Sequence, residues 1–61
     1  MNMSGQELKE AAIRLYGTYG WQSSLAAALH VDVSSVRRWT SGAVPVPGPV
    51  AAAVKCFERE R

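Results

Sequence analysis

Apolar residues recur every three or four positions in four segments of the chain, which is the spacing of one face of a helix. These segments cover about residues 5–16, 21–29, 33–40 and 49–59. The apolar positions that set the spacing are, in chain order, Leu8, Ala11, Ala12, Leu15, Tyr16, Leu25, Ala26, Leu29, Val33, Val36, Trp39, Val50, Ala53, Val54 and Phe57. No segment shows convincing strand alternation. The pattern predicts a compact all-α domain of four helices.

Residues with cap preferences mark the ends of these helices. Ser4 and Glu7 have the spacing of a capping box, in which hydroxyl and carboxylate each accept from a backbone N–H at the helix start. Gly17 is placed to end the first helix, Asp32 to cap the third and Gly42 to end it.

The segment AVPVPGPV, residues 43–50, separates the third and fourth helices. Proline lacks a backbone N–H and pushes its predecessor toward extended geometry. We therefore expect a stiff connector, with Pro49 in the first turn of the last helix.

The length of 61 residues predicts a single domain over residues 1–61. A chain of this size buries only about 60% of the surface that it exposes when unfolded, so its stability is marginal. Cys56 is the only cysteine, which excludes an intramolecular disulfide, and with His30 it lacks the second pair of a metal site. We expect regular helix packing supplemented by a homodimer, with no metal and no cofactor.

No targeting signal is expected from the sequence. Residues 1–10 are polar and lack the apolar core of a signal peptide, and no run approaches the ~20 apolar residues of a membrane span. A lone free cysteine suits a reducing compartment. A cytoplasmic protein without membrane contact is expected.

The formal net charge is only +2, but its distribution is uneven. Acidic residues gather near the two ends, at Glu7, Glu10, Glu58 and Glu60. Residues 11–57 contain Arg14, Arg37, Arg38 and Lys55 against Asp32 alone. Such a balance suits a polyanionic partner, although a solvated helix face has the same appearance.

The second and third helices form the central motif, about residues 22–41. Two short helices joined by about three residues cross steeply, as in a helix-turn-helix. Ala26 lies where they approach most closely, and the other packing positions are Leu25, Leu29, Val36 and Trp39.

The helix over residues 33–40 is then expected to carry its polar side chains outward, namely Ser34, Ser35, Arg37 and Arg38. A major groove admits a helix, serine bonds several base edges, and arginine binds guanine through two hydrogen bonds. The motif therefore favours double-stranded DNA as the partner.

The helix-turn-helix of the phage repressor and Cro-like family, also called the Xre family, resembles the pattern formed by Gln22, Leu25, Ala26, Leu29, Val31, Val36, Trp39 and Gly42. The likeness is closest over residues 21–47 and includes a later proline. It implies sequence-specific binding to double-stranded DNA by a small transcriptional repressor or autoregulator, acting as a dimer on an inverted-repeat operator.

The resemblance also implies roles for individual residues. Base contacts fall on Val33, Ser34 and Arg38. Contacts to the DNA backbone fall on Gln22, Ser35 and Arg37. The first of these, Gln22, stands at a helix start, where a phosphate is favoured.

The chain departs from the family in three ways. His30 replaces the usual left-handed glycine of the turn, a conformation that histidine adopts uncommonly. The family often has a fifth helix, for which this chain is short. Val33 and Ser34 replace longer polar side chains, so Arg38 is expected to make most of the contacts to bases. This small reading edge and the low net charge motivate an alternative, a helical protein–protein interaction module that keeps the fold without reading DNA.

The last helix and its connector are the expected dimer seam, through Val50, Val54 and Phe57. The competing assignment is that these residues close the monomer core. An enzymatic function is not expected, because His30 has no oriented partner or nearby nucleophile. Nothing in the sequence suggests a small-molecule ligand.

Overall fold

The computed structural model describes residues 3–60, which contain four α-helices and no strand. The helices are α1 (Gly5–Tyr16), α2 (Trp21–Leu29), α3 (Val33–Ser41) and α4 (Gly48–Glu60). The predicted all-α class with four helices is confirmed. Compared with the expected ranges, α3 ends one residue later, and α4 is longer by one residue at each end.

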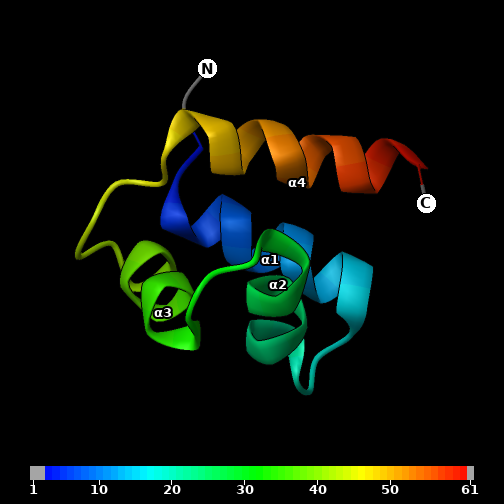
Figure 1. The fold of residues 1–61 in the computed structure, drawn as a ribbon, viewed down its shortest axis with the longest axis horizontal. Coiled ribbons are helices and arrows are strands. Elements are labelled where there is room, and N and C mark those ends of the chain that lie inside the picture. Colours follow the sequence, from blue (N-terminus) through cyan, green and yellow to red (C-terminus); the bar gives the residue numbers. More distant parts are fainter. Residues whose placement is uncertain (1–2, 61) are drawn as a thin grey trace.

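The central element is α1, which packs against α2, α3 and α4. The helix α2 also packs against α3, whereas α4 packs mainly against α1. Figure 1 shows α4 along one side of the molecule, with α2 and α3 toward the opposite side. The two helices of the central motif are therefore held together by a third helix outside it.

The predicted capping box at the start of α1 is confirmed. The Ser4 hydroxyl accepts from the backbone N–H of Glu7 at 3.0 Å, and the Glu7 carboxylate accepts from the backbone N–H of Ser4 at 2.9 Å. This backbone hydrogen bond lowers the pKa of Glu7, because it stabilises the ionised carboxylate.

The other predicted caps are confirmed in position. Gly17 and Gly42 stand at the ends of α1 and α3 with φ of 93° and 86°, a region that favours glycine. Asp32 occupies the N-cap position of α3, but its side chain makes no capping hydrogen bond. Its carbonyl accepts from the N–H of Ser35 at 3.0 Å instead, so the expected carboxylate cap was wrong.

The core lies where α1, α2 and α3 meet. Its buried members are Leu8, Ala11, Ala12, Trp21, Leu25, Ala26, Val36, Trp39 and Val54. As expected of the packing positions, Leu25, Ala26, Val36 and Trp39 are buried, and Leu29 is half-buried against the same cluster. A fully buried aliphatic side chain of this size contributes about 1.5–3 kcal/mol, so this cluster supplies much of the driving force for folding.

Gly5 marks a close approach between α1 and α3. A Cβ at this position would meet the main-chain carbonyl oxygens of Trp39 and Thr40, the latter at 3.0 Å. Both carbonyls belong to helix backbone, which cannot rotate away as a flexible side chain does. The absence of a side chain at Gly5 therefore lets the first turn of α1 rest directly on the last turn of α3.

The helix α4 closes the core from the α1 side. Ala51 and Val54 are buried, with Val54 fully inaccessible. The expectation that Val54 forms a dimer seam is therefore wrong, because its side chain is already used within the monomer. An ion pair between Arg14 Nε and Glu58 Oε2 at 2.9 Å joins α1 to α4, and this hydrogen bond raises the pKa of Arg14.

Within residues 3–60, none of the helices combines the length and the apolar character that crossing a membrane requires.

Candidate nucleic-acid interface

The turn between α2 and α3 depends on a left-handed residue. His30 has φ 59° and ψ 44°, and it is the one non-glycine residue with positive φ among residues 3–60. Its N–H donates to the carbonyl of Ala27 at 3.2 Å, and the N–H of Val31 donates to that of Ala26 at 3.0 Å. These bonds hold the chain in a conformation that costs an L-residue about 1–2 kcal/mol. The left-handed turn expected at His30 is confirmed.

This turn places α3 with one face in the core and the opposite edge in solvent. Val36 and Trp39 point inward, whereas Ser34, Arg37 and Arg38 are exposed. A helix with this orientation is able to enter a groove without unfolding any part of the domain.

Two of the residues expected to contact DNA are partly engaged within α3 itself. Arg38 Nη2 donates to Ser35 Oγ at 3.3 Å, which draws the guanidinium along the helix surface. Ser35 is half-buried rather than fully exposed.

Val33 differs more from its expected role as a base contact. Its side chain is half-buried and packs against the core cluster. This position lies at the border of the apolar stripe, where sequence spacing does not separate an outward side chain from an inward one. The exposed reading edge therefore reduces to Ser34 and Arg38.

The start of α2 lacks a side-chain cap. Its N-cap residue is Gly20 in a left-handed conformation, which has no side chain to accept from the first-turn N–H groups. Gln22 lies in this first turn and is half-buried. Uncapped N–H groups and the positive end of the helix dipole together favour an anion at such a place.

A hollow of about 330 Å³ lies beside this helix start, and we call it the basic hollow. It is lined by Lys9 of α1, by Trp21 and Gln22 of α2, and by Arg37, Thr40 and Ser41 of α3. Two of the expected backbone-contacting residues, Gln22 and Arg37, are thus brought together. Sequence reasoning missed Lys9, because its place beside α3 depends on the contact at Gly5 and leaves no local pattern.

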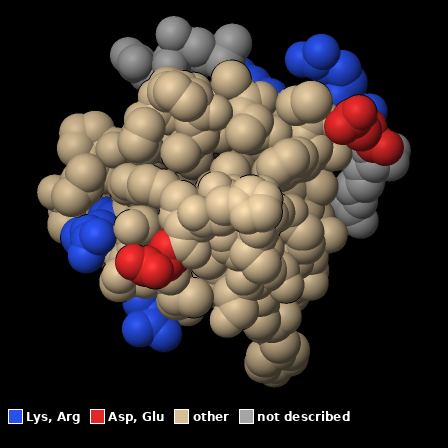
Figure 2. Space-filling model, in the orientation of Figure 1, with Lys and Arg blue, Asp and Glu red and all other residues tan. Residues whose placement is uncertain are grey.

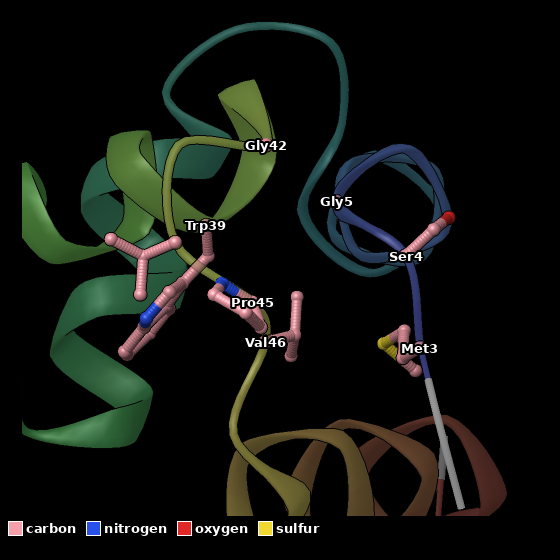
Figure 3. Close-up of a pocket in the computed structure, with 8 residues that line it drawn as sticks. Met3, Ser4, Gly5, Trp39, Gly42, Pro45 and Val46 are labelled. Carbon is pink, nitrogen blue, oxygen red and sulfur yellow. The ribbon is translucent and has the colours of Figure 1, made fainter.

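A second hollow of about 300 Å³ lies beside the last turn of α3, and we call it the apolar hollow. It is lined by Met3, Ser4, Gly5, Trp39, Gly42, Val44, Pro45 and Val46, none of which is charged. In Figure 3, Pro45 and Val46 of the connector lie between Trp39 on one side and Met3 on the other.

The charged side chains are unevenly spread over the surface. In the view of Figure 2, basic groups lie at the α3 edge of the molecule and near the end of α4, and the middle of this face has none. Among residues 3–60, no three His, Cys, Asp or Glu side chains are grouped as metal ligands.

Comparisons of this chain with protein-family models, curated proteins and solved structures gave no match. The resemblance to the Xre family therefore stays a prediction from the motif.

Proposed function

We propose that this chain binds double-stranded DNA in a sequence-dependent manner and acts as a small transcriptional repressor or autoregulator. The observation that carries the proposal is the orientation of α3, which follows a tight left-handed turn. This helix buries Val36 and Trp39, whereas Ser34, Arg37 and Arg38 are exposed. The major groove is about 12 Å wide and admits such a helix.

The candidate contact residues divide into two roles. Arg38 is the residue for guanine recognition, and in doing so it exchanges its bond to Ser35 for two bonds to the base edge. The Ser34 hydroxyl, which both donates and accepts hydrogen bonds, adds a short polar contact beside Arg38. Gln22 and Arg37 bind the sugar–phosphate backbone and fix the register of α3, without reading sequence.

We propose further that two copies bind together on an inverted repeat. A two-fold axis would place the recognition helices in successive major grooves about 34–36 Å apart. The residues left for a seam are Val50 and Phe57, which are half-buried on either side of the inaccessible Val54. Repression is then steric, because the bound dimer covers the operator.

Selection of bound duplexes from a random pool tests the proposal directly. An inverted repeat is the expected result. On the selected site, Arg38→Ala should lose about 1–3 kcal/mol of binding free energy at one base position, whereas Gln22→Ala should weaken all sequences alike.

The alternative is a protein-interaction module, and the partly buried Val33 and the Arg38–Ser35 contact are the observations on its side. If the pool yields no preferred sequence and duplex binding has no salt dependence, DNA binding is rejected and this alternative stands. A monomer at micromolar concentration with unchanged operator binding would reject the dimer alone.

A further inference from the structure

The basic hollow joins side chains from three helices around a common space. Lys9 comes from α1, Arg37 from α3, and the uncapped first turn of α2 contributes Gln22. No carboxylate lines this space, and its volume of about 330 Å³ accommodates a phosphodiester group. Trp21, which is 9% exposed, supplies an apolar wall on one side of this space.

Neither cation of the hollow is neutralised within the described chain. Among residues 3–60, Arg14 pairs with Glu58 and Arg38 donates to Ser35, whereas no hydrogen bond or ion pair involves the side chain of Lys9 or Arg37. Two like charges beside one space raise the local positive potential, which an anion between them lowers.

The hydroxyl groups of the hollow are already in use as donors. Thr40 Oγ1 donates to the carbonyl of Val36 at 3.0 Å, and Ser41 Oγ donates to that of Arg38 at 3.1 Å. The groups left for an anion are therefore the two cations, the Gln22 amide and the first-turn N–H groups of α2.

We infer that the basic hollow holds one backbone phosphate of bound DNA between Lys9 and Arg37. This inference rests on the proposed function and adds to it a contact from α1, outside the helix-turn-helix motif. Because α1 is seated on α3 at Gly5, a phosphate held by Lys9 fixes the depth and direction of α3 in the groove.

The test compares Lys9→Gln, Arg37→Gln and the double variant with Lys55→Gln, Arg59→Gln and their double variant. Each pair removes the same charge, but Lys55 and Arg59 are exposed on α4 and line neither hollow. Binding to the selected duplex is measured from low to high salt, and circular dichroism checks that every variant stays helical.

The hollow variants should bind about 10- to 100-fold more weakly than the α4 controls, with the order of preferred sequences unchanged. The slope of log affinity against log salt should fall by about 0.9 in the double hollow variant, because one phosphate contact is lost rather than two.

A second measurement follows Trp21 directly. In a Trp39→Phe background, duplex DNA should change the emission of Trp21, and the double hollow variant should abolish this change.

The two possible failures are distinguishable. If the hollow variants match their controls in affinity and slope, the phosphate site is wrong and DNA binding stands. If the unaltered chain shows no salt-dependent binding to duplex DNA, the proposed function fails and the phosphate site fails with it.

Discussion

The apolar hollow and the basic hollow have similar volumes, about 300 and 330 Å³, and both lie beside the C-terminal half of α3. Each has a buried tryptophan in its wall, Trp39 in the first and Trp21 in the second. The apolar hollow is built from α1, α3 and the connector, whereas the basic hollow is built from all three helices of the core.

The difference between them arises within one turn of α1. Gly5 lines the apolar hollow and Lys9, about one turn later, lines the basic one. The glycine brings two backbones together, and the lysine reaches past that contact to place a charge beside Arg37. The packing of α1 on α3, as well as the local sequence, therefore decides where these cationic side chains gather.

The largest expected effect comes from Gly5→Ala, which disturbs the backbone contact between α1 and α3 beside which both hollows lie. The new methyl group would meet helix carbonyls of α3, so we expect a loss of about 1–3 kcal/mol in the free energy of unfolding. Chemical denaturation measures it. Gly48→Ala is the matched control, since nothing lies within 4 Å of a Cβ there, and it should cost nothing. Equal losses in both variants would show that α1 is not seated on α3 through Gly5.

A smaller effect is expected at the two turns that flank α3. His30→Gly removes the left-handed strain before α3 and should raise the free energy of unfolding by up to about 1 kcal/mol, because glycine's extra unfolded-state entropy offsets part of the gain.

Gly42→Ala, at the turn beside the apolar hollow, should have the opposite effect. It should lower the free energy of unfolding by about 1–2 kcal/mol. Its cost is conformational alone, since φ is 86° and a Cβ meets no atom within 4 Å. Thermal melts of the two variants should move in opposite directions. A shift in the same direction would mean that strain at these turns does not control stability.

The smallest effect concerns acid. Folding lowers the pKa of Glu7 below its ordinary value of 4.5, so its carboxylate stabilises the fold above that pH and loses this contribution as pH falls through the folded-state pKa. Unfolding curves between about pH 6 and pH 3 should therefore decline less steeply in Glu7→Gln than in the unaltered chain.

This acid effect belongs to one hollow only. Ser4, the partner of Glu7, lines the apolar hollow, whereas no carboxylate lines the basic hollow. Phosphate-dependent DNA binding should therefore persist at pH values where the cap at α1 has weakened.

The sequence was sufficient for the helices and most of the core. Helical spacing and local caps act over a few residues, so the bounds of α1 and the burial of Leu25 and Ala26 followed from short stretches of chain. The left-handed conformation of His30 was expected from the resemblance to the Xre family, which usually has glycine at this position of the turn.

The errors occurred where the answer depends on distant contacts. Val33 and Val54 belong to apolar stripes, but only the seating of neighbouring helices decides which members of a stripe are covered. The same is true of Lys9, whose place in the basic hollow follows from a backbone contact between α1 and α3. Gly5 and the carbonyls of Trp39 and Thr40 that it contacts are more than thirty positions apart, and no local pattern records such a contact.

The attachment of α4 has a consequence for how the domain opens. The helices α1, α2 and α3 all pack against one another, whereas α4 depends mainly on α1. Amide hydrogens of α4 are therefore free to exchange with solvent through a partial opening that costs less than global unfolding. During such an opening the three remaining helices keep their mutual contacts, so the most labile part of the domain lies on the side away from the exposed edge of α3.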